Sequence, residues 1–248
     1  MVSARSALTL LTSFSFVVAC GPLEDPAPSE GGEEALDVDD VGKHESALTT
    51  NVGLAAVADT EVVKSSPNRT AGAQTTVRVR QSGSTRSLFR FDTADIQSAV
   101  QGKTLLRARL RVTLNTATSN MTTSGRNVDV HRMTAAWTET GASWSCANDT
   151  VPGNSTLNCA TEDRWTMGTA PLPYAAPAAV TQLVANNYAG YVTFDVTADV
   201  SAILADPATN LGWLIKLQNE SLSGSLVFRS HDLSDPPRLI IDVAGPCG

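Results

Sequence analysis

Two segments decide the fold: Arg86-Ser-Leu-Phe-Arg-Phe-Asp92 and Phe228-Arg-Ser-His-Asp-Leu-Ser-Asp-Pro-Pro-Arg-Leu-Ile-Ile-Asp242. The first predicts a short strand that ends in an acidic turn. The second predicts a strand, a polar turn interrupted by Pro236 and Pro237, and a final apolar strand. Together they bracket one β domain, and neither carries a catalytic motif.

The chain between these two segments is typical of short strands separated by polar turns. The segment Leu105 to Leu114 alternates most cleanly, with apolar residues at 108, 110, 112 and 114 and arginines at 107, 109 and 111. Such alternation indicates a strand with one buried face. The other predicted strands are Val57 to Val63, Thr75 to Arg80, Val128 to Met133, Tyr191 to Asp195, Leu211 to Leu217, Ser225 to Arg229 and Arg238 to Val243. This spacing favours an all-β, jelly-roll-type β-sandwich.

We expect one or two short helices to interrupt the strands. The segments Phe91 to Ile96 and Phe194 to Val200 each begin with Phe-Asp, and the predicted helix caps are Asp92, Asp95, Asp195 and Asp199. Carboxylates at strand ends are also hard oxygen ligands, so calcium is a cofactor that they could hold. Asp59 and Asp195 are the candidate metal ligands, although no EF-hand spacing supports them.

Residues 1–20 predict a bacterial lipoprotein signal peptide. Arg5 is followed by an uncharged run that is too short to span a membrane, and the segment ends Val-Val-Ala-Cys20. This ending resembles the lipobox, whose cysteine is acylated and becomes the mature N-terminus, so Cys20 is the predicted lipidation site. The alternative is an ordinary secretory signal with an incidental cysteine. We expect an exported protein, anchored by lipid alone at the outer membrane or cell surface or otherwise secreted.

Residues 21–48 predict a disordered acidic tether. Nine of the 25 acidic residues lie in this stretch, which carries too little apolar surface to offset the entropy of ordering. Two of the 18 basic residues lie before position 49, so residues 49–248 carry equal numbers of acidic and basic side chains. The acidic charge therefore belongs to the tether and does not indicate the partner of the β domain.

The cysteines predict one disulfide bond. Cys146 and Cys159 flank a polar loop, and no CxxC pair or nearby histidine completes a zinc site. In an exported chain, a disulfide closing about 14 residues would contribute about 3 kcal/mol. Because Cys20 is assigned to lipid, Cys247 is left either free or joined to another chain.

Several short sequence motifs occur in this chain in a characteristic order. They are Ala58-Asp-Thr60, Arg86-Ser-Leu-Phe-Arg-Phe-Asp92, the strand Leu105 to Leu114, His131-Arg-Met-Thr-Ala-Ala-Trp137-Thr-Glu, Val192-Thr-Phe-Asp195-Val-Thr, Phe228-Arg-Ser and Pro236-Pro-Arg-Leu. Their order resembles a DNRLRE domain, similar to the family-96 carbohydrate-binding modules and the disaggregatase-related β domains, over roughly residues 50 to 244. The resemblance implies polysaccharide binding, with acidic sugars among the ligands. The family's common setting includes an attached enzyme domain, and these 248 residues show none, so we expect a free-standing surface module.

The residues suggest how an acidic polysaccharide could be bound. The carbohydrate-binding candidates are basic residues that alternate with apolar ones, namely Arg78, Arg80, Arg107, Arg109 and Arg111, with Lys64 and Arg69 as extensions. Guanidinium groups bind carboxylates in a bidentate manner, so a basic sheet face suits a polyuronate. The alternative is a solvated face whose arginines pair with neighbours such as Glu61 and Asp92.

A neutral sugar would instead need aromatic platforms. The candidates are Trp137, Trp144, Trp165, Trp213, Tyr188 and Tyr191. Trp213 lies in an apolar run and is expected in the core, and the other tryptophans are expected to pack under the long loop. Hydrophobic stacking is therefore the second choice.

Other classes of function find little support. The segment Gly141-Ala-Ser143-Trp-Ser145 lacks the second glycine of a nucleophile elbow, and His131 lies on a predicted strand. We therefore expect no catalysis, although a carboxylate-pair lyase or glycosidase stays open. A neutral domain on an outer surface also argues against nucleic-acid binding. The remaining alternative is a structural surface or matrix protein that binds a protein partner, and we expect a monomer.

Overall fold

The computed structural model describes residues 48–81, 84–115, 119–154, 156–186, 188 and 190–245. Its strands are β1 (Leu48–Ala55), β2 (Ala58–Val63), β3 (Thr76–Arg80), β4 (Thr85–Arg90), β5 (Thr104–Thr113), β6 (Arg126–Arg132), β7 (Val180–Val184), β8 (Tyr191–Asp195), β9 (Trp213–Leu217), β10 (Ser225–Arg229) and β11 (Arg238–Gly245). Its helices are α1 (Thr93–Val100) and α2 (Thr197–Ala205), with short 3-10 turns at Thr161–Asp163 and Pro207–Thr209. Within these residues, no helix has the length and apolar character needed to cross a bilayer.

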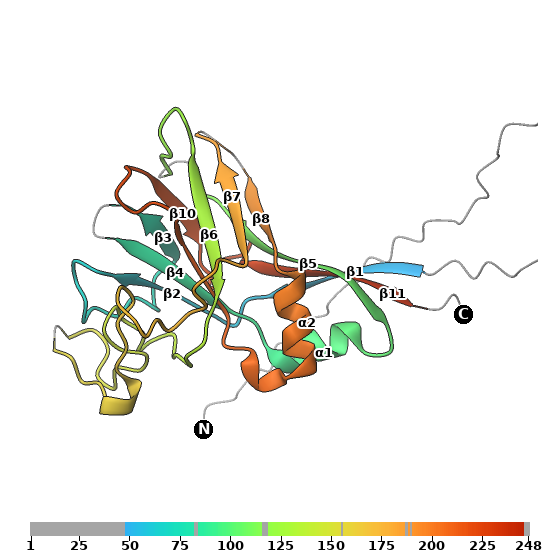
Figure 1. The fold of residues 1–248 in the computed structure, drawn as a ribbon, viewed down its shortest axis with the longest axis horizontal. Coiled ribbons are helices and arrows are strands. Elements are labelled where there is room, and N and C mark those ends of the chain that lie inside the picture. The colour runs from blue at the N-terminus through green and yellow to red at the C-terminus, as the bar shows by residue number, and fades with distance from the viewer. Residues whose placement is uncertain are drawn as a thin grey trace, which may run out of the picture.

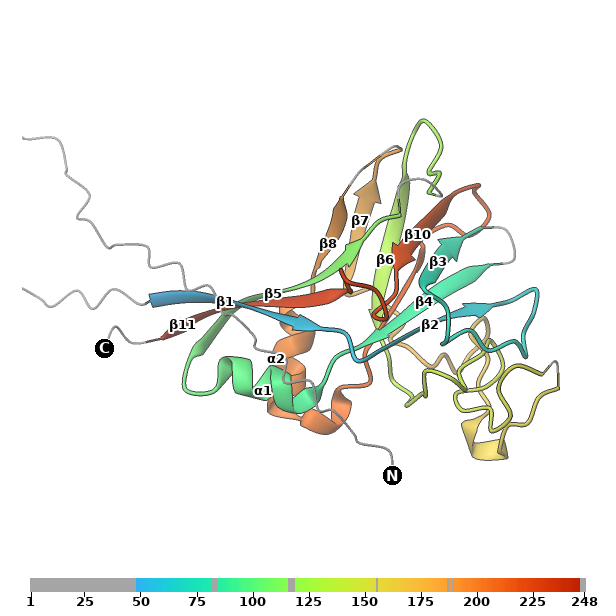
Figure 2. The ribbon, with the colours of Figure 1, turned by 180° about the vertical axis from the view of Figure 1, so that it is seen from behind.

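The strands form two antiparallel sheets that pack face to face (Figures 1 and 2). The four-stranded sheet has the order β1-β11-β5-β8, and the seven-stranded sheet has the order β10-β3-β4-β9-β6-β7 with β2 paired to β4. The chain crosses between the sheets repeatedly, for example from β4 to β5 and from β5 to β6. The prediction of an all-β sandwich with two short helices is confirmed.

The main core lies between the sheets because alternate residues of each strand point inward. Val77 and Val79 of β3 and Leu110 of β5 are fully buried there. Phe91 meets Trp213 edge to face, with ring centroids 6.0 Å apart. Helices α1 and α2 lie side by side under the four-stranded sheet and extend this core (Figure 1).

The helix caps agree with the prediction only in part. The Asp92 carboxylate accepts hydrogen bonds from the backbone N–H groups of Ala94 and Asp95, so Asp92 caps α1 as predicted. Asp195 accepts a hydrogen bond from the Thr197 N–H group at the start of α2. The predictions for Asp95 and Asp199 as caps were wrong, because both lie inside the first turn of their helices. Asp199 instead accepts a hydrogen bond from the Trp213 indole at 2.8 Å.

A second core lies on the outer side of the seven-stranded sheet, beneath the long loop between β6 and β7. The loop contributes buried tryptophans and methionines, and the sheet contributes residues such as Leu88 and Leu214. Its buried aromatic residues are Trp137, Trp144, Trp165 and Tyr174. The loop therefore covers part of a sheet face that would otherwise expose apolar side chains to water.

Sequence patterns missed two strands, β1 and β7. Both are edge strands, and three of the five residues of β7 are exposed, so β7 shows little apolar alternation. The predicted signal peptide, Cys20 and nearly all of the tether lie outside the described residues, as does Cys247. Leu48, assigned to the tether, is the first residue of β1.

Candidate functional site

The five candidate arginines lie on two different sheets, which corrects the prediction of one basic face. Arg78 and Arg80 are on β3 of the seven-stranded sheet, whereas Arg107, Arg109 and Arg111 are on β5 of the four-stranded sheet. Both sets of arginines point away from the core. The inward positions are occupied by apolar residues, namely Val77 and Val79 on β3 and Ala108, Leu110 and Val112 on β5. A sandwich has two outer faces, so the two sets cannot contact one flat ligand together.

The β3 arginines are held by internal contacts. Glu61 is completely buried, and its carboxylate accepts hydrogen bonds from Arg78 Nε at 2.8 Å and Nη2 at 2.6 Å. These bonds hold the pKa of Arg78 above its ordinary value. Arg69 approaches the same carboxylate at 3.7 Å, and Arg80 Nε donates to the Thr85 hydroxyl group. Arg78 therefore neutralises a buried charge, as the salt-bridge alternative expects.

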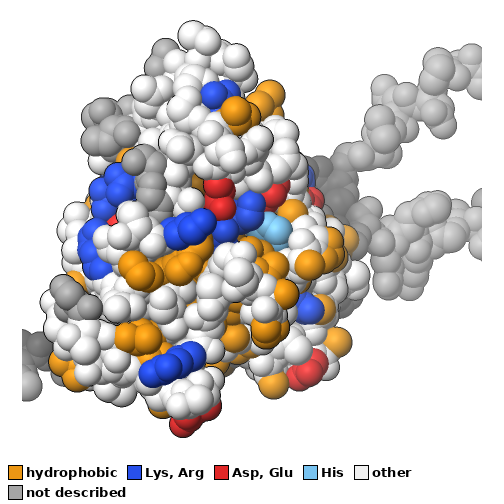
Figure 3. Space-filling model, turned by 60° about the vertical axis from the view of Figure 1, so that its left-hand side comes forward, with side chains coloured by type: hydrophobic (Ala, Val, Ile, Leu, Met, Phe, Trp, Pro, Cys, Tyr) orange, Lys and Arg blue, Asp and Glu red, His pale blue; other side chains and the backbone are white. Residues whose placement is uncertain are grey.

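Basic groups on this side of the molecule lie among acidic and apolar ones. The space-filling view shows Lys and Arg side chains in small groups, next to Asp or Glu side chains and orange apolar surface (Figure 3). Lys64 and Arg69, the proposed extensions of the arginine row, are exposed. This mixture does not form a continuous basic strip on the face shown.

The outer face of the four-stranded sheet brings four arginines together, and we call it the arginine face. Its members are Arg107, Arg109 and Arg111 of β5 and Arg238 of β11. Arg238 was not among the predicted binding residues, although the sequence alternates there: Arg238, Ile240 and Asp242 alternate with the buried residues Leu239, Ile241 and Val243. In the antiparallel pairing of β11 with β5, Arg238 lies directly opposite Arg111.

Two of these four arginines have carboxylate partners. Arg109 Nη2 lies 2.7 Å from Asp242 Oδ2, and Arg107 Nε lies 3.2 Å from Asp195 Oδ2. Burial alone would raise the pKa of Asp195, but hydrogen bonds from Thr197 and Arg107 hold that pKa below its ordinary value. The face therefore carries two more guanidinium groups than carboxylates.

The other two arginines face each other without an acidic partner. Arg111 and Arg238 are cross-strand neighbours, and among the described residues neither forms a salt bridge. Like charges directly opposite on neighbouring strands are unfavourable. The Arg111 guanidinium lies 4.9 Å from the ring centroid of Tyr191, a residue that is 51% exposed. This corner of the arginine face combines two free guanidinium groups with an aromatic ring.

The tryptophans do not offer a stacking surface. Trp213 is fully buried in the main core, and Trp137, Trp144 and Trp165 are at most 9% exposed in the second core. The expectation that they serve packing is confirmed. Tyr188 and Tyr191 are about half exposed. A pocket of about 370 Å³ opens in the long loop, and Trp165, which lines it, is only 9% exposed.

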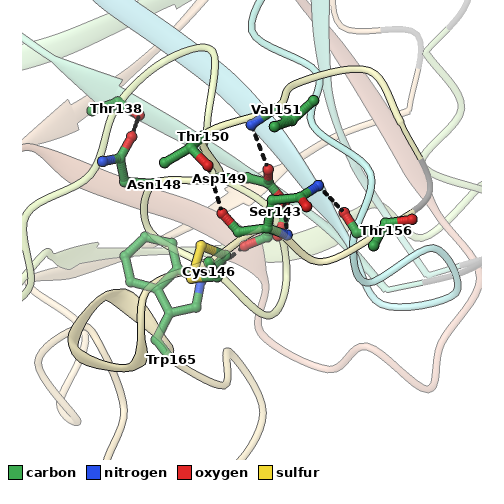
Figure 4. The surroundings of a disulfide bond; sticks show 11 residues. Thr138, Ser143, Cys146, Asn148, Asp149, Thr150, Val151, Thr156 and Trp165 are labelled. Atoms are coloured by element: carbon green, nitrogen blue, oxygen red, sulfur yellow. Dashed lines mark hydrogen bonds between the residues drawn. A yellow bond between two sulfur atoms is a disulfide. The ribbon is translucent and has the colours of Figure 1, made fainter.

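The predicted disulfide bond is present and stabilises the long loop (Figure 4). Cys146 and Cys159 have Cα atoms 5.9 Å apart, and Cys159 pairs in a short bridge with Asp149. The Asp149 carboxylate accepts hydrogen bonds from the N–H groups of Val151 and Asn158. Trp165 donates from its indole to the Ser143 carbonyl group at 2.8 Å. The loop is thus a packed unit with its own internal bonds.

Arg86 fastens this loop to the sheet. The side chain is only 6% exposed and forms two 2.8 Å hydrogen bonds to the Glu220 carboxylate. It also donates to the Met167 carbonyl group and to the Tyr174 hydroxyl group, and lies 4.6 Å from the ring centroid of Trp144. The position of Arg86 in a strand gave no sign of this role.

Of the candidates His131, Asp59 and Asp195, only Asp59 lies in a cluster of ligand-type side chains among the described residues. His131 Nδ1 lies 2.9 Å from the Ala175 carbonyl oxygen, and burial lowers the pKa of His131, which agrees with a structural role. Asp195 contacts Arg107 and Thr197 and belongs to no cluster of ligand-type side chains among the described residues. Asp59 does belong to one, together with Glu139 and His231.

Together, these observations define an all-β sandwich with one arginine-rich sheet face and a disulfide-bonded loop over the other sheet. Residues 50–168 match the model of Carbohydrate-binding module family 96. The chain is therefore similar to the family-96 carbohydrate-binding modules over this segment, as the sequence motifs predicted. The match supports a carbohydrate-binding role. It runs from within β1, through β6, into the long loop, so it includes Arg107, Arg109 and Arg111 but not Arg238. No curated protein matches the sequence.

Proposed function

We propose that the protein is a non-catalytic carbohydrate-binding module that binds an acidic polysaccharide through the arginine face. The observation that carries this proposal is the unpaired cross-strand pair Arg111 and Arg238. A carboxylate bound between two opposed guanidinium groups would relieve their repulsion and accept hydrogen bonds from both. The similarity to family-96 modules supports the carbohydrate part of the proposal.

The shape of the face also suits an extended chain. A sheet surface presents side chains at regular intervals, with neighbouring strands about 4.8 Å apart. Arg107 and Arg109 already hold carboxylates of the protein, so they can exchange partners with those of a ligand at modest cost near the surface. Tyr191 adds an exposed ring beside Arg111, on which a sugar ring could stack. The site is therefore an open surface that could bind along a polymer.

The test is retention of the purified full chain in gels that contain a polyuronate or a neutral polysaccharide, at low and high salt. We expect retention by the polyuronate that decreases with salt, because screening weakens contacts between exposed charges. Equal, salt-independent retention by the neutral polymer would contradict the acidic-ligand proposal. A lack of retention by every glycan would instead favour a structural protein that binds a protein partner.

We further propose that Cys20 is lipidated and that residues 21–47 tether the module to the outer membrane or cell surface. The support is the Val-Val-Ala-Cys20 ending and the acidic composition of the following stretch. More than one acyl chain is required for stable anchoring. Expression in a bacterial host should place the chain in the membrane fraction with labelled fatty acid. Cys20→Ala should abolish the label, and a label that persists in this variant would refute the assignment.

A further inference from the structure

Three ligand-type side chains from distant segments meet at one end of β2. Asp59 comes from β2, Glu139 from the long loop and His231 from the turn between β10 and β11. His231 Nδ1 lies 3.2 Å from Glu139 Oε1 and 3.5 Å from Asp59 Oδ2. Each side chain offers one ligand atom, and these atoms all lie within 4.8 Å of one another. The fold therefore assembles two carboxylates and one imidazole around a common point.

The hydrogen bonds of the cluster leave buried atoms without partners. Asp59 is 0% exposed, and its Oδ2 atom accepts a hydrogen bond from the His231 backbone N–H group at 2.5 Å. Asp59 Oδ1 is buried and accepts no hydrogen bond of ordinary geometry within the protein, and His231 Nδ1 has only its ion-pair contacts to Glu139 and Asp59. Leaving such groups unsatisfied is costly, so native structures seldom do so without a bound species.

Burial also perturbs both carboxyl groups of the cluster. Removal from water raises the pKa of Asp59 to about 6, although the His231 N–H group and imidazole act in the opposite direction. Burial likewise raises the pKa of Glu139. Both shifts arise because the two carboxyl groups are partly removed from water where they approach each other.

The cluster is held in position by its surroundings. The Asp59 N–H group donates to Glu139 Oε1 at 3.3 Å, which orients that carboxylate. A Cβ atom at Gly72 would lie 2.1 Å from the Glu139 carbonyl oxygen, so glycine is needed for this close approach. His231 Nε2 faces Asp232 Oδ1 at 3.7 Å on the far side of the ring. A carboxylate in that position often orients a metal-binding histidine.

We propose that Asp59, Glu139 and His231 form a binding site for a divalent transition-metal ion, zinc by preference, that stabilises the fold. Zinc accepts imidazole nitrogen and carboxylate oxygen ligands, whereas calcium takes oxygen ligands. Three protein ligands leave a coordination position for water. The ion would connect β2, the long loop and the β10–β11 turn, which the hydrogen bonds of Asp59 already bring together. The site is separate from the arginine face and does not depend on sugar binding.

The test uses the full chain, stripped with a chelator and then titrated with zinc chloride, with thermal unfolding and bound metal as the readouts. We expect one equivalent of zinc that raises the melting temperature. His231→Gln should abolish both effects, and Glu139→Gln should weaken binding if the first variant folds poorly. Asp235→Asn, in the same turn but outside the cluster, is the matched control and should bind zinc like the parent chain.

A second measurement excludes binding by the cysteines at 20 and 247. Cobalt bound at the proposed site should show no thiolate charge-transfer absorption, because the ligands are oxygen and nitrogen. Asp232→Asn should weaken zinc binding by roughly 10-fold, as expected for a residue that orients a metal-binding histidine. Unchanged melting with zinc, equal binding by His231→Gln, or a preference for calcium would each overturn the proposal. If zinc leaves the melting temperature unchanged, the cluster is only a histidine in contact with two carboxylates.

Discussion

Replacing both unpaired arginines by glutamine, in the variant Arg111→Gln with Arg238→Gln, separates a binding role from a structural one. The two side chains are opposed on neighbouring strands and have no acidic partner among the described residues. Glutamine keeps much of the aliphatic stem and removes the charge, so packing against the sheet is largely preserved. The substitution therefore changes electrostatics more than shape.

The expected magnitudes have opposite signs for folding and for binding. Removing a directly opposed like-charge pair should raise the free energy of unfolding by a few tenths of a kcal/mol, or leave it unchanged. For binding, each lost contact between a partly exposed guanidinium and a ligand carboxylate is worth about 1 kcal/mol. Two such contacts amount to about 2 kcal/mol, which corresponds to roughly a 30-fold loss of affinity for a polyuronate.

The assay pairs calorimetric titration of a polyuronate with urea unfolding. The matched control is Arg80→Gln with Arg229→Gln, which removes the same charge from the seven-stranded sheet. We expect this control to bind nearly as tightly as the parent chain, because its arginines lie outside the arginine face. Equal losses of affinity in both variants would show a non-specific charge effect. A large loss of stability in the Arg111 and Arg238 variant would refute the claim that the pair is free for a ligand.

Three further predictions concern the long loop and the buried histidine. Replacing Cys146 and Cys159 together by alanine should lower the free energy of unfolding by about 3 kcal/mol, and an unchanged urea midpoint would contradict this. Glu220→Gln should cost about 3 kcal/mol because it leaves the buried Arg86 guanidinium without its charge partner. It should also speed proteolysis of the loop, so a cleavage rate equal to that of the parent would argue against the anchoring role. Because burial lowers the pKa of His131 from 6.5, the unfolded chain binds more protons near and below that pH, and stability from this residue should fall as the medium is acidified below about pH 6.5. An NMR titration midpoint of His131 at or above 6.5 would contradict the sign.

The strands were predictable where one of their faces is buried. In Leu105 to Leu114 the alternation of apolar and basic residues corresponds to β5, and the inward residues Ala108, Leu110 and Val112 are fully buried. The edge strands β1 and β7 were not predicted, since an edge strand with exposed residues carries a weaker apolar pattern. The disulfide between Cys146 and Cys159 was predictable because few pairings were open to an exported chain with these cysteines.

The sites depended on contacts that no local pattern contains. Glu139 and His231 approach Asp59 from positions 80 and 172 residues away. Arg86 appears in the sequence as one of several strand arginines, yet it is buried against Glu220 and the long loop. Polar residues that meet only after folding give no periodic signal, so sequence reasoning could name Asp59 as a ligand candidate but not its partners.

By itself, the sequence determined which residues of β3 and β5 face inward, and hence that the arginines at 78, 80, 107, 109 and 111 face outward. This follows because alternation is a local property of the pleated backbone. Only the tertiary structure decided that these arginines divide between two sheets and that Arg238 lies opposite Arg111. Strand order depends on how all the apolar faces are buried together, which is a property of the whole chain.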